Sequence, residues 1–312
     1  YTTYVLPTLL YGLEALVLTT AEMELLEKFN RKCLRYIQHL PQSTANCALF
    51  LLLGHLPIEA QIHIKALTFF RNIIDDENKS PPSQYMKNII TRQLAMKEDQ
   101  TTSWVAMIRG LLRTYKLPSA YAMLENVPSK RRWKDTVQTG VHNYWEKVLK
   151  SEAKEMSTME LLNIDGCKPG KLHPVWKNIT SQLDILKATV KAQLLIKRYP
   201  LASSMTAGQK RKSMCPLYEV EPETTSHFLL RCNKLQQIRQ QYLPKIINYN
   251  EDHQLSRVPV SPDSLVRNIL DSSYIDGSSP TQETLCRNYM FKLHHERSKL
   301  LGGRSGYKLK YD

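Results

Sequence analysis

Three side chains that commonly bind metals lie close together in the sequence, at Cys215, His227 and Cys232. Their spacing is Cys-x2-Tyr-x8-His-x4-Cys, so Tyr218 stands where a further cysteine would complete a set of four ligands. Structural zinc is held almost always by four Cys or His ligands in a tetrahedron. With three donors, we expect Zn²⁺ to bind weakly and substoichiometrically. The alternative is a finger-like turn held without metal by its own apolar residues, Phe228, Leu229 and Leu230.

A basic stretch leads directly into this Cys/His segment. No acidic residue lies between Asp184 and Glu219. A basic run beside a small metal-stabilised finger is typical of proteins that bind nucleic acid. The residues of this stretch that we expect to contact nucleic acid are Lys187, Lys191, Lys197, Arg198, Lys210, Arg211 and Lys212.

Two further groups of basic residues are candidates for the same role. Ser129 can cap a long helix whose first turn carries Lys130, Arg131, Arg132 and Lys134. Basic residues at a helix N-terminus oppose the helix dipole, which favours a reason other than local stability, such as phosphate binding or a nuclear-import signal. The other group flanks an earlier amphipathic helix, where either a solvated face or phosphate contact would account for it. Its members are Lys28, Arg31, Lys32 and Arg35.

The overall charge indicates a polyanionic partner. The chain has 43 basic and 29 acidic residues among 312, a formal net charge of +14. RNA and DNA are the simplest partners for such a field, although a basic helix can also contact acidic lipid. Six scattered cysteines and the lack of a signal-peptide pattern predict an intracellular protein, in the cytoplasm and nucleus. The apolar windows 5–18 and 47–58 are shorter than the roughly 18 residues that a membrane span requires, so we expect no membrane partner.

Apolar residues recur at three and four residues along most of the chain, which is typical of amphipathic helices. This periodicity predicts helices over 23–37, 43–53, 58–73, 84–97, 104–115, 119–124, 129–148, 178–197, 235–246, 263–270 and 281–301. The expected core stripe of the first is Met23, Leu26, Phe29, Cys33, Leu34 and Ile37. The expected core stripe of the long basic helix is Trp133, Val137, Val141, Trp145 and Val148. We therefore expect a mainly α fold.

The ends of the first helices have their own signals. Thr19 and Glu22 have the spacing of a capping box. Ser43 can cap a short helix that stops at Gly54, and Pro57 suits the first turn of the next. The window 5–18 is apolar nearly all round and should be a buried helix.

Changes in composition divide the chain into five segments. We expect a thumb-like helical bundle over 1–77, a helical linker over 78–127 and a basic helical region over 128–212. A degenerate Cys/His finger with its following helix should occupy 213–247, and C-terminal helices with a flexible tail 248–312. We also expect the chain to be part of a longer protein.

No set of residues points clearly to catalysis. Asp75 and Asp76 resemble a polymerase metal pair, but they end a predicted helix, whereas such a pair needs a strand hairpin. Cys167 and His173 fit an ordinary surface pair better than a metal site. No glycine-rich phosphate loop and no Ser-His-Asp pattern stands out. We therefore expect this chain not to be an enzyme by itself.

Several motifs resemble the reverse transcriptases of LINE-type, non-LTR retrotransposons. Segments 11–14 (Tyr-Gly-Leu-Glu), 29–35 (Phe-Asn-Arg-Lys-Cys-Leu-Arg) and 52–58 (Leu-Leu-Gly-His-Leu-Pro-Ile) look like the region just after the polymerase palm. Segments 214–218 (Met-Cys-Pro-Leu-Tyr) and 223–232 (Glu-Thr-Thr-Ser-His-Phe-Leu-Leu-Arg-Cys) resemble the Cys/His element near the end of those polyproteins. Tyr218 departs from the family pattern, which has cysteine there.

The resemblance implies a division of roles. The catalytic polymerase domain would lie upstream and would be a partner of this chain. The chain itself would be a non-catalytic thumb and C-terminal region that positions RNA template and target DNA. The alternative is a decayed or reused transposon remnant that acts as a helical interaction module without enzymatic activity.

Overall fold

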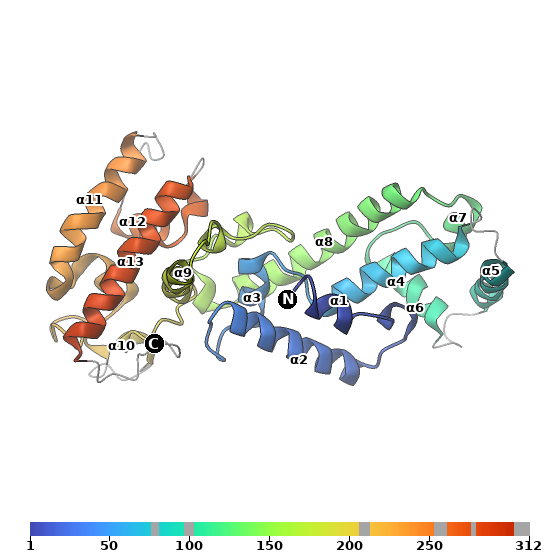
Figure 1. The fold of residues 1–312 in the computed structure, drawn as a ribbon, viewed down its shortest axis with the longest axis horizontal. Helices are drawn as coiled ribbons and strands as arrows, with labels where there is room; N and C mark the ends of the chain where they lie inside the picture. The colour runs from blue at the N-terminus through green and yellow to red at the C-terminus, as the bar shows by residue number, and fades with distance from the viewer. Residues whose placement is uncertain (76–80, 97–102, 206–212, 253–260, 276–278, 303–312) are drawn as a thin grey trace. The chain divides into compact units, whose positions relative to one another are not determined.

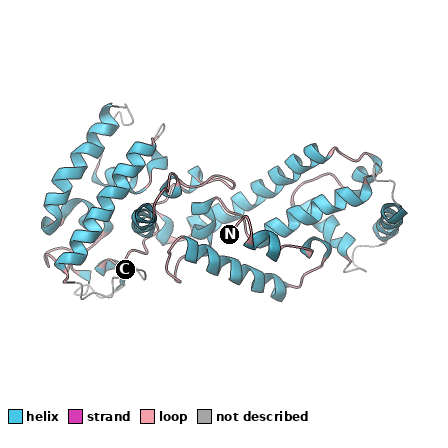
Figure 2. Ribbon diagram, in the orientation of Figure 1, coloured by secondary structure: helices cyan, strands magenta, loops and turns pink. Residues whose placement is uncertain are grey.

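The computed structural model describes residues 1–75, 81–96, 103–205, 213–252, 261–275 and 279–302 (Figure 1). Their secondary structure is helical, apart from one isolated antiparallel bridge between Met214 and Pro222 (Figure 2). The expectation of a mainly α fold is confirmed. Lys210, Arg211, Lys212 and the tail from 303 lie outside the described residues.

The chain forms two compact units, and each takes residues from more than one expected segment. The first comprises Tyr1–Leu34 and Leu56–Leu149, and the second comprises Arg35–His55 together with the chain from Lys150 onward. Helices of the first unit are α1 (Val5–Leu9), η1 (Leu13–Ala15), α2 (Thr20–Ile37), α4 (Ile58–Ile74), α5 (Pro81–Ala95), α6 (Trp104–Thr114), α7 (Ala120–Glu125) and α8 (Lys130–Lys154). The last residues of α2 and α8 belong to the second unit.

The second unit contains mostly C-terminal helices. Its longer ones are α3 (Asn46–Leu53), α9 (Gln182–Leu195), α11 (Gln236–Asp252), α12 (Pro262–Leu270) and α13 (Pro280–Leu300). Its short ones are η3 (Ser157–Met159), η4 (Ile164–Gly166), η5 (Pro174–Trp176), α10 (Ala202–Met205), η7 (His227–Arg231), η8 (Asn233–Leu235) and η9 (Ser272–Tyr274). Helix α13 packs against both α9 and α11.

The core of the first unit forms where α4 to α8 meet. Trp133, Val137 and Val141 of α8 are buried there, as their four-residue spacing predicts. The indole of Trp133 donates a hydrogen bond to the carbonyl oxygen of Leu67 at 2.9 Å, so this buried ring has no unpaired polar atom. Val148, the last residue of the predicted stripe, is 37% exposed.

The first eighteen residues differ from the expectation of one buried helix. Helix α1 ends at Leu9, and Gly12 adopts a left-handed conformation (φ +78°) before the short turn η1. Only Leu6 and Leu10 of this stretch are buried, and they pack against Ile58 and Ile62 of α4. The prediction failed because the window lacks the polar face that would reveal where a helix is interrupted.

Helix α2 also presents a different face to the core than its apolar pattern predicts. Glu27, Asn30 and Leu34 are its buried residues, whereas Phe29 is 44% exposed. A carboxylate oxygen of Glu27 accepts the backbone amide of Glu59 at 3.1 Å, in the first turn of α4. A carboxylate is favourable there because the first amides of a helix have no partner within it. Burial raises the pKa of Glu27.

The predicted helix signals are mostly confirmed. The amide of Thr19 donates to Glu22 Oε2 at 2.8 Å, and the amide of Glu22 donates to Thr19 Oγ1 at 3.3 Å, which forms the capping box. Gly54 ends α3 with φ +61°, and a Cβ there would lie 2.3 Å from the carbonyl oxygen of Lys171. Ser43 is wrong as a cap, since α3 begins after Ala45 without a side-chain cap.

A half-buried histidine in the first unit makes stability depend on pH. Burial lowers the pKa of His63 to about 4, and His63 Nδ1 lies 2.7 Å from the hydroxyl of Tyr115. An unfolded chain has an ordinary histidine pKa of about 6.5, so below that pH the unfolded state takes up a proton that the folded state does not. We expect this group to lower the free energy of unfolding by about 3 kcal/mol as the pH falls from 7 to 4.

Urea unfolding of the wild type and of His63→Gln at pH 7, 5.5 and 4 measures this effect. The difference in unfolding free energy between the two proteins should change steadily in favour of the variant as the pH falls. Parallel pH profiles of the two proteins would contradict the assignment to His63.

No single described helix is long and apolar enough to cross a membrane. Helices α3 and α4 meet the length and composition criteria only when they are counted together across the break between them.

Candidate metal centre and basic surfaces

Cys215, His227 and Cys232 come together in the second unit. Their candidate ligand atoms all lie within 4.8 Å of one another, and the two sulfur atoms are 3.8 Å apart. All three residues are buried. This group could therefore hold a metal ion, as the spacing in the sequence predicts.

Two local structures position the three side chains. The chain reverses around Cys215. The amide of Cys215 donates to the carbonyl oxygen of Glu221, and the amide of Glu219 donates to the carbonyl oxygen of Cys215, both at 2.8 Å. Glu219 takes a left-handed conformation (φ +55°) at this reversal. The single π-helical turn η7 then places His227 at its start and Cys232 directly after its end. Such turns are rare and are found frequently at functional sites.

The hydrogen bonding of His227 suits a metal ligand. Its Nδ1 lies 3.1 Å from a carboxylate oxygen of Glu221, while its Nε2 is buried without a hydrogen-bond partner. Ligating histidines usually donate their other ring nitrogen to a carboxylate, which fixes the tautomer and raises the basicity of the ligand atom. A buried nitrogen without a partner is costly, and a bound ion would satisfy it.

Tyr218 is engaged elsewhere in this turn. Its hydroxyl accepts a hydrogen bond from Asn233 Nδ2 at 2.9 Å. Burial raises the pKa of the Cys215 thiol to about 11. A hydrogen bond from the backbone amide of Leu217 opposes this effect by lowering the pKa. Cys215 is therefore a neutral thiol near pH 7, and a metal ion has to displace its proton.

A buried acidic residue within the Cys/His segment, Glu223, has a structural partner. Glu223, which lies between Cys215 and His227 in the chain, is 1% exposed and Arg297 of α13 is 0% exposed. Arg297 donates from Nε and from Nη2 to the two carboxylate oxygens of Glu223, at 2.7 and 2.8 Å. The amide of Ala202 also donates to Glu223 at 2.7 Å. Glu223 thus joins the Cys/His segment to α10 and α13.

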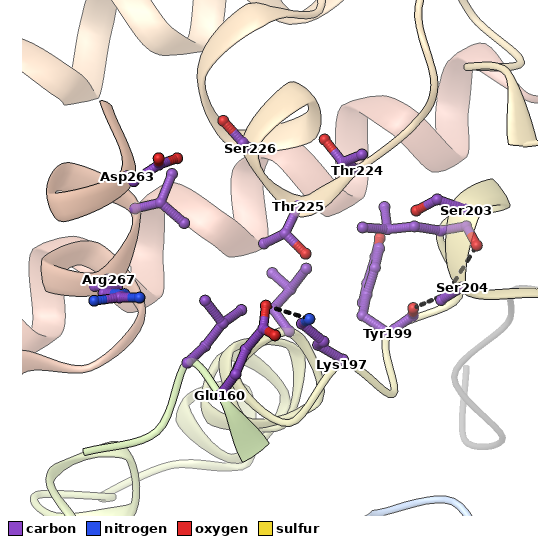
Figure 3. A pocket seen from close by; sticks show the side chains of 14 residues that line it. Glu160, Lys197, Tyr199, Ser203, Ser204, Thr224, Thr225, Ser226, Asp263 and Arg267 are labelled. Atoms are coloured by element: carbon purple, nitrogen blue, oxygen red, sulfur yellow. Dashed lines mark hydrogen bonds and ion pairs between the residues drawn. The ribbon is translucent and has the colours of Figure 1, made fainter. Parts of the chain in front are cut away.

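A pocket of about 550 Å³ lies beside this segment (Figure 3). Thr224, Thr225 and Ser226, which directly precede His227, line one part of it. Lys197 lies on another part and forms an ion pair with Glu160. Because that carboxylate already neutralises Lys197, the pocket gives little support to a phosphate contact there.

Lys191 does not lie on a nucleic-acid surface. It is 0% exposed, and its ammonium group lies 2.7 Å from a carboxylate oxygen of Glu283. The expected contact between Lys191 and nucleic acid is wrong, because the second half of α9 is buried on all sides. In the same stretch, Lys187 lies 3.6 Å from Asp184, and Lys187 and Arg198 are half-buried.

The basic residues at the start of α8 are placed differently. They are all exposed, and within the described ranges no carboxylate forms an ion pair with any of them. We call this group the α8 cluster: Lys130, Arg131, Arg132 and Lys134. The hydroxyl of Ser129 accepts the amide of Arg132 at 3.4 Å, so the predicted helix cap is confirmed.

The basic flank of α2 is mixed. Lys28 and Lys32 are exposed, whereas Arg31 lies 2.6 Å from Glu24. Arg35, which belongs to the second unit, donates hydrogen bonds to the carbonyl oxygen of Thr44 at 3.1 Å and to Asn46 Oδ1 at 2.8 Å. Fewer cations are thus free on this helix than its sequence suggests.

The remaining candidates are structural. Asp75 caps the end of α4 and is ion-paired with Arg71, so the reading of this acidic pair as a helix end is confirmed for Asp75, while Asp76 lies outside the described residues. Cys167 and His173 were expected on the surface and are both buried.

Asp271 is a residue that the sequence analysis missed. His173 Nε2 lies 3.2 Å from Asp271 Oδ1, and Asp271 Oδ2 accepts the amide of Asn163 at 2.7 Å. Burial opposes the charged form of Asp271, but His173 and the donated hydrogen bonds hold its pKa well below the ordinary range. No local pattern signals this role, because His173 and Asn163 are about a hundred residues away in the chain.

Comparisons with family models, with curated proteins and with solved structures found no match to this chain.

Proposed function

We propose that the chain is a non-catalytic nucleic-acid-binding protein. The observation that carries this proposal is the α8 cluster, four exposed cations without ion-pair partners in the described structure. Neutralising phosphates with such groups releases condensed counterions, which drives association. The net charge of +14 supports the same partner class, RNA and DNA.

The proposal assigns Zn²⁺ to Cys215, His227 and Cys232. Thiolate and imidazole donors are the ligands that structural zinc prefers. The carboxylate of Glu221 beside His227 Nδ1 and the unpartnered Nε2 support this assignment. A metal ion there would fix the reversal at Cys215 to η7, and binding would remain weak because Tyr218 supplies no fourth donor.

The proposal also keeps the family relationship that the motifs suggest. The chain would be the region after the palm of a non-LTR retrotransposon reverse transcriptase, acting in the cytoplasm and nucleus with an upstream polymerase domain. Its role would be to position RNA template and target DNA rather than to form bonds. The motifs of segments 214–218 and 223–232 support this relationship.

Substitution of the α8 cluster tests the nucleic-acid proposal. A variant with Gln at Lys130, Arg131, Arg132 and Lys134 should bind a labelled oligonucleotide at least tenfold more weakly at low salt. Its plot of log affinity against log salt should be shallower by about three, since each lost phosphate contact removes about 0.7 to 0.9 from the slope. Fluorescence anisotropy at several salt concentrations measures both quantities.

A matched control removes the same charge elsewhere. A control variant with Gln at four other exposed lysines should retain most of the affinity for the oligonucleotide. These residues are Lys168, Lys171, Lys234 and Lys292. Equal losses in the two variants would assign binding to net charge and not to the α8 cluster. A wild-type affinity that is flat across salt would contradict nucleic-acid binding through phosphates.

Exposed apolar residues favour a second function, that of a helical interaction module. They lie near the N-terminus: Tyr4, Tyr11, Leu16, Val17, Leu25 and Phe29 are between 44% and 86% exposed. Exposed apolar residues that gather in one patch mark protein interaction sites. Under this alternative, charge-reversed variants of Leu25 and Phe29 would reduce self-association or partner binding, while the α8 variant would not.

A further inference from the structure

The first unit has a groove that runs beside α8. It has a volume of about 750 Å³, within the size range of ligand sites. From α8 it is lined by Asp135, Thr136, Thr139, Gly140, Asn143, Tyr144 and Lys147. They form two rows at four-residue intervals, one at 135, 139, 143 and 147 and the other at 136, 140 and 144, so they share one side of the helix. Arg132 of the α8 cluster lies one turn before Thr136 on the same side.

The other wall of the groove is the turn that ends α6. The amide of Leu117 donates to the carbonyl oxygen of Leu112 at 2.8 Å, and Lys116 adopts a left-handed conformation with φ +55°. A Cβ on Gly140 would lie 3.0 Å from the carbonyl oxygen of Tyr115, so the absence of a side chain lets the turn approach α8.

Lys116 is an unusual residue for its position. A helix end of this kind places glycine where the backbone is left-handed, because any other residue brings its Cβ near a carbonyl oxygen. Gly54 fills the corresponding position at the end of α3. A positive charge at a helix C-terminus offsets part of the cost at Lys116. Backbone strain that a fold retains is concentrated at functional sites.

The side chains of the groove are available to a ligand. Lys116, Lys147 and Asn143 are exposed, and among the described residues no ion-pair or hydrogen-bond partner is found for any of their three side chains. Tyr144 is 39% exposed and its ring packs edge to face on Tyr115 at 5.3 Å between centroids. Asp135 is the one carboxylate in the lining, so two ammonium groups outweigh it.

We infer that this groove binds a single strand of nucleic acid, which specifies the ligand form for the nucleic-acid-binding function and rests on that proposal. Lys116 and Lys147 contact phosphates from the two walls, Asn143 bonds to backbone oxygens, and Tyr144 stacks on a base. Electropositive grooves with an aromatic residue are how proteins hold single strands. A duplex keeps its bases stacked internally and offers Tyr144 no free base face.

Lys116→Gly is the sharpest test because binding and stability should move in opposite directions. The variant relieves the left-handed strain, so the urea midpoint should rise, while affinity for a single-stranded oligonucleotide should fall several-fold. A lysine with a purely structural role would not lower affinity. Asn178→Gly is the control: Asn178 also has φ +54°, lies outside the groove and should change affinity not at all.

Tyr144→Ala tests the single-strand form of the ligand. Loss of base stacking should weaken binding of single-stranded RNA or DNA by about tenfold, with little effect on the corresponding duplex. Tyr144→Phe retains the ring and should restore most of the affinity. Comparison of RNA with DNA oligonucleotides shows which sugar the groove prefers.

The outcomes separate this inference from the broader function. If Lys116→Gly and Tyr144→Ala bind single strands like the wild type while the α8 cluster variant does not, the groove inference is wrong and the nucleic-acid function stands. Equal losses for single strands and duplexes would overturn the single-strand assignment. If the wild type binds no oligonucleotide at all, both fail.

Discussion

Arg297→Met should lower the free energy of unfolding of the second unit by about 3 to 5 kcal/mol, because it leaves the Glu223 carboxylate buried without its counter-charge. Glu223 is 1% exposed, and both of its oxygens accept hydrogen bonds from Arg297. The amide of Ala202 remains as a donor, but one neutral donor does not replace a guanidinium. Urea unfolding of the full chain, followed by circular dichroism, measures the change.

Two further variants make this test specific. Lys154→Met breaks an exposed pair with Asp165, whose side chains are 56% and 78% exposed, and should barely move the urea midpoint. The double variant Glu223→Leu with Arg297→Met removes both charges and should recover much of the loss, since apolar replacement of a whole buried pair is often tolerated. If Arg297→Met changes the urea midpoint as little as Lys154→Met does, the Glu223–Arg297 pair does not stabilise the second unit as its geometry indicates.

Tyr218→Cys should raise the zinc content of the purified chain from a small fraction to about one equivalent, because it supplies the fourth donor of a tetrahedral site. Tyr218 lies in the same reversal as Cys215, and its amide donates to the carbonyl oxygen of Cys215 at 3.2 Å. Four-ligand sites bind zinc tightly enough to add to folding stability, so chelator should then lower the melting temperature of the variant. Elemental analysis after dialysis under reducing conditions gives the metal content.

The matched control is Tyr218→Phe. It removes the hydroxyl that bonds to Asn233 but adds no ligand, so its zinc content should stay at the wild-type level. Adding Cys215→Ser to Tyr218→Cys should abolish the gain. An unchanged zinc content in Tyr218→Cys itself would show that the finger interpretation is wrong, and that the turn is held by its apolar residues alone.

The helices were largely predictable because their signals are local. Helices α6 and α13 both begin and end within one residue of their predicted limits. Apolar spacing and capping residues act within one or two turns, so the sequence displays them directly. The prediction of one continuous helix over 5–18 was wrong because these residues are apolar nearly all round, so no polar face marks the end of α1 at Leu9.

The candidate metal group was also predictable in part. Cys215, His227 and Cys232 lie within 18 residues of one another, so a single reversal and one helical turn suffice to bring them together. Glu221 was not predicted as the partner of His227, although it lies in the same segment. The sequence around Glu221 contains no feature that distinguishes a glutamate bonded to a histidine from one that faces only solvent.

The sequence by itself determined the mainly α class, most helix limits, the excess of positive charge and the grouping of Cys215, His227 and Cys232. Only the tertiary structure decided which cations are free: Lys191 is buried against Glu283, whereas the α8 cluster remains exposed. The physical reason is separation along the chain. Helical periodicity and charge are properties of neighbouring residues, but the partner of Lys191 is 92 residues away, and only packing of α9 on α13 brings the two together.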